Sequence, residues 1–149
     1  QTINTKMQHI KLNGEYLSEF LLHSYIASYL NVPVVFLSGD AGLCDEAKRI
    51  DKNIVTVPVK KAAGGSTINI HPQLALDLIK SGVEESLKKD FSLYRIELPK
   101  EFELEIAYNE NYDVLRALNY ENVEQIGNRA VRFRTKDYMD VVRAIGFLV

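Results

Sequence analysis

The residues from Leu17 to Asp40 constrain the fold of this chain more than any other stretch. The first half reads LSEFLLHSYIASYL, in which apolar side chains surround the helical axis on nearly all sides. A helix of this kind is expected to lie inside a protein. The second half, VPVVFL, predicts a short strand that is apolar on both faces and ends in Ser-Gly-Asp. Such strands are typical of parallel sheets covered by helices, so the stretch predicts an α/β protein.

Glu19 and His23 are the polar residues in the middle of this predicted buried helix. They are four positions apart, so both side chains project from one face. A buried carboxylate without a partner is costly, so we expect Glu19 to contact a cation, a cluster of donors or a metal ion. The two side chains could share a metal ion or hydrogen-bond to each other, and the second arrangement is the commoner one in protein cores.

The rest of the chain carries a mixture of strand and helix patterns. Strands are predicted at 7–12, 34–37, 54–59, 91–98, 101–108, 123–126 and 130–134, and helices at 15–30, 41–50, 72–88, 109–118 and 136–147. These elements predict a layered α/β/α fold with a mixed, partly parallel sheet and a strand-rich C-terminal portion. The 149 residues form either a single domain or the C-terminal portion of a longer enzyme. Because composition changes after residue 90, we divide them into a core α/β part, 1–90, and a strand-hairpin-helix part, 91–149.

Composition excludes several classes of function. The net charge of -2 argues against a surface for nucleic acid or for anionic membranes. No apolar run approaches the roughly 20 residues of a membrane span, and no charged-then-apolar leader opens the chain. Cys44 is the single cysteine, which rules out an internal disulfide and favours a reducing compartment, so we expect a cytoplasmic protein. A secreted protein without disulfides would have the same cysteine content. Because the chain begins with Gln1 rather than Met, we also expect a piece of a longer protein.

The remaining candidate site residues carry weaker signals. Asp40 precedes a predicted helix and is interpreted as its N-cap rather than as a catalytic carboxylate. The basic, glycine-rich segment 60–67 lacks the order G-x-x-x-x-G-K-[ST] of a phosphate-binding loop, so we interpret it as a flexible loop. Asp40, Gly64 and Gly65 therefore remain candidates for lining a pocket. His9 is interpreted as a partly exposed strand residue, and Cys44 as a small buried one. From the residues alone we predict an α/β domain, and we expect any functional site to lie near Glu19.

One long ordered motif runs through the first part of the chain. It reads NGEYLSEF at 13–20, YIA at 25–27 and VPVVFLSGD at 32–40. Further matching positions are Val59-Lys60, His71-Pro72, Val123, Arg132-Phe133 and Asp137-Tyr138. In these residues the chain resembles the C-terminal part of the zinc-dependent D-aminopeptidase family of bacteria and archaea.

The resemblance implies a metallopeptidase that holds a pair of zinc ions and releases N-terminal D-residues, such as D-alanine, from short peptides. It implies that Glu19 is a metal ligand. In the whole enzyme, zinc would polarise the scissile carbonyl and lower the pKa of a bound water. The resemblance also implies a homo-oligomer, such as a large ring.

The chain departs from the family pattern in three ways. The other metal ligands of the family, an Asp-x-Glu pair and two histidines, belong to sequence upstream of Gln1. The catalytic histidine of the family falls on Gln1 or just before it, and an amide cannot replace an imidazole in acid–base or nucleophilic chemistry. His23 stands where the family usually has Asn, so it either adds to the site or replaces a polar core contact. We therefore expect the chain as given to be inactive alone. The alternative is a non-catalytic α/β domain, for assembly or for binding a small ligand, that lacks a complete metal site.

Overall fold

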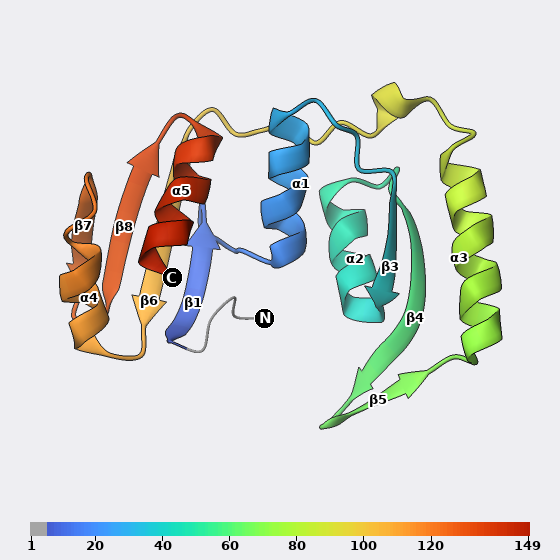
Figure 1. Ribbon diagram of the computed structural model, residues 1–149, viewed down its shortest axis with the longest axis horizontal. Helices are drawn as coiled ribbons and strands as arrows, with labels where there is room; N and C mark the ends of the chain where they lie inside the picture. Colours follow the sequence, from blue (N-terminus) through green and yellow to red (C-terminus); the bar gives the residue numbers. More distant parts are fainter. Residues whose placement is uncertain (1–5) are drawn as a thin grey trace. The chain divides into compact units, whose positions relative to one another are not determined.

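The computed structural model describes residues 6–149, which pack into two compact units (Figure 1). The first unit contains residues 6–26 and Leu98–Val149, and the second contains Ala27–Glu97. The boundary falls inside helix α1 (Glu19–Tyr29). The sequence analysis divided the chain at residue 90, on composition. Packing groups the early residues with the late ones because β1 pairs with β6.

An antiparallel sheet of five strands forms the first unit, in the order β2-β1-β6-β8-β7. Its strands are β1 (Met7–Leu12), β2 (Glu15–Tyr16), β6 (Phe102–Tyr108), β7 (Val123–Gly127) and β8 (Ala130–Thr135). Helices α4 (Asn111–Ala117) and α5 (Tyr138–Leu148) pack against β6 and β8. The sheet therefore has one face that helices cover and one face that carries charged side chains.

Strand β6 shows how the sequence builds this core. Phe102, Leu104 and Ile106 are buried, whereas the glutamates between them are not, which confirms the predicted half-solvated strand. Tyr138 at the start of α5 packs against the ring of Phe102 in a tilted arrangement and donates its hydroxyl proton to the Leu22 carbonyl at 2.9 Å. A buried tyrosine needs such an acceptor, and this one ties α1 to the first unit.

The second unit contains a mixed sheet of three strands in the order β3-β4-β5. Strands β3 (Phe36–Asp40) and β4 (Val55–Ala63) are parallel, and β5 (Ser66–Asn69) pairs with β4 in the antiparallel direction. Helices α2 (Ala41–Ile50) and α3 (Pro72–Ser86) lie on either side of the β3–β4 pair in Figure 1. A short 3-10 helix, η1 (Phe91–Leu93), follows α3. The predicted α/β class with a mixed, partly parallel sheet is confirmed.

Three predicted elements differ from the structure. Helix α1 begins at Glu19 rather than at residue 15, because Glu15 and Tyr16 pair with β1. The segment 60–67, interpreted as a loop, belongs to the β4–β5 hairpin, in which Gly64 adopts a φ of 61°. The strand predicted at 91–98 is absent from the described residues, where η1 is followed by irregular chain without ladder pairing. None of the described helices has the length and apolar character needed to span a membrane.

Candidate functional site

Glu19 is the first residue of α1, where Ser18 caps the helix by accepting the amide proton of Leu21 at 3.0 Å. The prediction that Glu19 is buried is wrong, since its side chain is exposed. The residues that α1 buries are Leu21 and Ser24, three positions apart, and Glu19 lies on the opposite side of the helix. A carboxylate in the first turn is favourable there because of the partial positive charge of the helix N-terminus.

His23 is oriented by the backbone of the same helix. Its Nδ1 lies 2.7 Å from the main-chain carbonyl oxygen of Glu19, so Nδ1 donates the hydrogen bond. In a neutral imidazole that donates through Nδ1, the lone pair is on Nε2. Both side chains are exposed, and the hydrogen bond of His23 goes to the Glu19 carbonyl rather than to its carboxylate. The predicted side-chain pair is therefore replaced by a side-chain-to-backbone contact.

These two residues do not form a complete metal site. Zinc in proteins is usually bound by three or four side chains. Within residues 6–149, no group of three or more His, Cys, Asp and Glu side chains is placed to hold a metal ion. Glu19 offers one carboxylate and His23 one imidazole, so zinc would need ligands from elsewhere. The role of Glu19 as a ligand stays a prediction.

Asp40 and Cys44 occupy the structural roles that the sequence favoured. Asp40 caps α2, accepting the amide proton of Gly42 at 2.8 Å, which confirms the N-cap interpretation. Cys44 is 3% exposed, and burial raises the pKa of its thiol. A thiol that stays protonated is a poor nucleophile, so Cys44 acts as a small core residue.

The other predicted positions give no assembled site. Gly64 and Gly65 form the exposed turn of the β4–β5 hairpin. Gln1, on which the catalytic histidine of the family would fall, lies outside the described residues. His9 is half-buried in β1 and contacts Glu105 at 3.2 Å, as expected for a strand histidine. Whether Asp40, Gly64 and Gly65 line a pocket stays a prediction.

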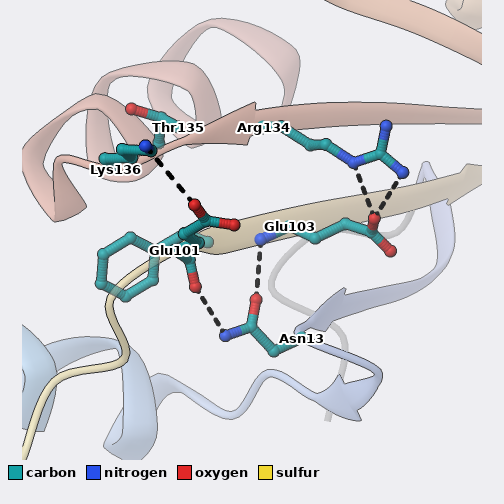
Figure 2. A pocket seen from close by; sticks show the side chains of 7 residues that line it. Asn13, Glu101, Glu103, Arg134, Thr135 and Lys136 are labelled. Atoms are coloured by element: carbon teal, nitrogen blue, oxygen red, sulfur yellow. Dashed lines mark hydrogen bonds and ion pairs between the residues drawn. The ribbon is translucent and has the colours of Figure 1, made fainter.

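The structure adds a pocket of about 490 Å³ in the first unit that the sequence did not reveal (Figure 2). It is lined by Asn13, Glu101, Phe102, Glu103, Arg134, Thr135 and Lys136. Asn13 in the β1–β2 turn accepts the amide proton of Glu103 at 2.7 Å and donates to the carbonyl of Glu101 at 3.0 Å. These bonds attach the turn to β6.

The charges around this pocket are already paired with one another. Arg134 lies 2.8 Å from Glu103, and Lys136 lies 3.5 Å from Glu101, as Figure 2 shows. The sequence does show alternate glutamates in and just before β6 and basic residues in and just after β8, but only the pairing of these strands brings them together. The pocket therefore has no unpaired acid, base or nucleophile among its charged residues and does not resemble a reaction centre.

Comparison with known proteins gives a consistent result. The chain matches the D-aminopeptidase family over residues 1–147. A D-aminopeptidase of Bacillus subtilis (strain 168) is 25% identical over 142 residues, which are 93% of this chain and 52% of that protein. The solved structure of the Zn-dependent D-aminopeptidase DppA from Bacillus subtilis, a self-compartmentalizing protease, superposes with a TM-score of 0.83 at 21% identity. The superposition covers 99% of this chain and 56% of DppA, so the chain spans about half the length of these relatives.

Proposed function

The chain belongs to the D-aminopeptidase family, and we propose that it is the C-terminal portion of a zinc metallohydrolase. The proposed reaction is the release of N-terminal D-amino acids, such as D-alanine, from short peptides. The observation that carries the proposal is the family match over almost the whole chain, which includes the motif around Glu19.

The position of Glu19 supports its role as a zinc ligand. The Glu19 carboxylate is exposed at the start of a capped helix. It can therefore bind a metal ion whose other ligands come from another part of the polypeptide. The zinc ions, a pair by resemblance, would take their remaining ligands from the half of the protein that its relatives have and this chain lacks. We therefore propose that the chain has no peptidase activity by itself.

Two further properties belong to the proposal. DppA is a self-compartmentalizing protease, which supports a homo-oligomer of the complete protein. The single cysteine, Cys44, is buried as a thiol, which supports a reducing compartment and a cytoplasmic location.

A second candidate function is a non-catalytic domain for assembly or small-ligand binding. It is favoured by the lack of a three-ligand cluster within residues 6–149. The two candidate functions differ in whether the complete polypeptide hydrolyses a D-peptide.

The test is a peptidase assay on the protein extended to its natural start, with D-alanyl-D-alanine and L-alanyl-L-alanine as substrates. We expect hydrolysis of the D-dipeptide in clear preference to the L-dipeptide. A chelator should abolish the activity, and added zinc should restore it. Absence of D-dipeptide hydrolysis from a folded, zinc-loaded extended protein would contradict the proposal and favour the non-catalytic domain.

A further inference from the structure

His23 presents a ring nitrogen that is free to bind a cation. Its Nδ1 lies 2.7 Å from the main-chain carbonyl oxygen of Glu19, and a carbonyl oxygen only accepts, so Nδ1 carries the proton. In the neutral ring this leaves the lone pair on Nε2. The side chain is exposed, and no hydrogen bond or ion pair within residues 6–149 engages Nε2.

The hydrogen bond of His23 is of the kind that supports metal ligands. A histidine that binds a metal ion through one ring nitrogen almost always donates its other ring proton to a backbone carbonyl, a carboxylate or water. That bond fixes the tautomer and the orientation of the ring, and it makes the ligating nitrogen more basic. The Glu19 carbonyl is such an acceptor, so the helix backbone already holds His23 in the tautomer that a metal ion requires.

The other two histidines of the chain have the opposite arrangement. Nδ1 of His71 accepts the amide proton of Gln73 at 3.2 Å, so the neutral ring carries its proton on Nε2. Nε2 of His9 lies 3.2 Å from the Glu105 carboxylate, which accepts, so this Nε2 is protonated as well. Of the three histidines, His23 is therefore the one whose Nε2 can bind a metal ion directly.

Glu19 provides a second donor on the same side of the helix. Glu19 and His23 are one turn apart in α1 and both exposed, so their side chains are neighbours on the helix surface. No ion pair within residues 6–149 involves the Glu19 carboxylate. Carboxylate oxygen and imidazole nitrogen are both common ligands of zinc, so the chemistry of the two donors fits this metal.

We propose that His23 is a zinc ligand of this protein and binds the ion through Nε2, beside the Glu19 carboxylate. The inference rests on the proposed function, in which Glu19 is a zinc ligand, and it adds a ligand one helical turn further along the chain. His23 stands where the family resemblance places Asn, whose neutral amide is not among the usual ligands of zinc. His23 therefore strengthens the zinc site of this protein beyond what Glu19 alone provides.

Competition with a chelator of known zinc affinity tests the proposal on the extended protein. Loss of an outer-shell partner already lowers metal affinity by about 10–100-fold, so His23→Asn should weaken zinc binding by about tenfold or more. His71→Asn is the matched control, because it makes the same change at another exposed histidine and asparagine also caps helices well. It should keep the zinc affinity of the parent. Equal zinc affinities of His23→Asn and the parent would overturn the proposal.

Anomalous diffraction at the zinc edge, from crystals of the extended protein, separates a ligand from a residue that acts through Glu19. A direct ligand places Nε2 of His23 about 2.0–2.1 Å from the ion. A zinc ion on Glu19 that lies beyond ligand distance from His23 would overturn the proposal, even if His23→Asn lowers the affinity.

This inference and the proposed function fail in distinguishable ways. Zinc-dependent D-peptidase activity in an extended protein whose zinc ions do not contact His23 would reject the added ligand alone. Zinc bound by both Glu19 and His23 in an extended protein that leaves D-peptides intact would reject the proposed function alone.

Discussion

The two units of the chain complete their hydrophobic cores to different extents. In the first unit, core residues from β6, β8 and α5 are at most 1% exposed; they are Leu104, Ile106, Val131, Tyr138, Val141 and Leu148. In the second unit, α3 buries only Gly82 and Ser86 and leaves three leucines between 41% and 61% exposed, namely Leu74, Leu76 and Leu78, and its C-cap Leu87 is 59% exposed. The first unit also exposes Tyr112 and Leu115, and the second buries Ala47 and Ile54, so the difference lies in the helices. Helix α5 buries five of its residues, whereas the longer α3 buries two and presents an apolar surface.

Sheet type explains much of this difference. An antiparallel sheet needs cover on one face, and the alternation along β6 provides one apolar and one charged face. A parallel pair such as β3–β4 needs cover on both faces and neighbours at its edges. The comparison teaches that side chains on the helix of the second unit contribute less to stability than those in the core of the first unit. The following predictions test it, from the largest expected effect to the smallest.

The largest effect on stability is expected from a substitution that creates a cavity in the core of the first unit. Ile106 is fully buried, so Ile106→Ala should lower the free energy of unfolding by about 2–5 kcal/mol. Leu76→Ala, at a position 61% exposed on α3, should change it by about 0.5 kcal/mol or less. Urea denaturation of both variants measures the difference. If Leu76→Ala costs as much as Ile106→Ala, the surface of α3 is covered and the comparison fails.

A pair of glycine substitutions compares helix packing in the two units. A Cβ at Gly82 in α3 would lie 2.7 Å from the Phe36 ring and 3.0 Å from Val57, so Gly82→Ala should destabilise by about 1–3 kcal/mol. A Cβ at Gly146 in α5 meets nothing within 4 Å, so Gly146→Ala should stabilise by about 0.5–1 kcal/mol. Thermal unfolding of the two variants should therefore shift in opposite directions. A stabilising Gly82→Ala would mean that α3 does not pack closely on β3 and β4.

High pH should weaken the first unit through its buried tyrosines. Burial raises the pKa of Tyr108 to about 12, and burial followed by the charge of Tyr25 also raises the pKa of Tyr138. The folded state thus favours the protonated phenols, so their contribution is fully present below about pH 10 and is lost as the pH rises through the folded-state pKa.

Denaturation curves between pH 9 and pH 12 measure this loss. Tyr108→Phe should make the alkaline decline shallower, whereas Tyr112→Phe, at a position 73% exposed, should leave it unchanged. Identical slopes for Tyr108→Phe and the parent chain would show that Tyr108 does not titrate in the way its burial requires.

The smallest effect is expected on the charged face of the first unit. Glu103 pairs with Arg134 at 2.8 Å and with Arg132 at 3.4 Å, but these side chains are 27% to 58% exposed. Surface ion pairs contribute little, so Glu103→Gln should cost about 0.5–1 kcal/mol, and the cost should shrink in high salt. A salt-independent loss of several kcal/mol would show that the face is buried against another surface.

The parts of the fold that follow from local patterns could be predicted from the sequence. The alternation around Leu104, the N-cap Asp40 and the buried Cys44 each depend on a few neighbouring residues. The strand predicted at 91–98 shows the limit, because alternation there lacks a partner strand in residues 6–149. A strand pattern needs a neighbour to become a strand.

The candidate site was less predictable, because it depends on contacts between distant residues. The burial of Glu19 was inferred from apolar residues around α1, yet tertiary packing selects only Leu21 and Ser24 as its buried residues. The pocket between Asn13 and Arg134 requires β6 to pair with β8 and the β1–β2 turn to hydrogen-bond to β6. Such long-range pairings leave no local signal in the sequence.

Zinc content tests the central claim, that Glu19 belongs to a metal site completed by upstream sequence. Elemental mass spectrometry on the native extended protein should find zinc near stoichiometric amounts, and Glu19→Ala should lose most of it. Glu84→Ala, at an exposed position on α3, is the matched control and should retain the metal. A Glu19→Ala protein that holds as much zinc as its parent, or an extended protein without zinc, would contradict the account.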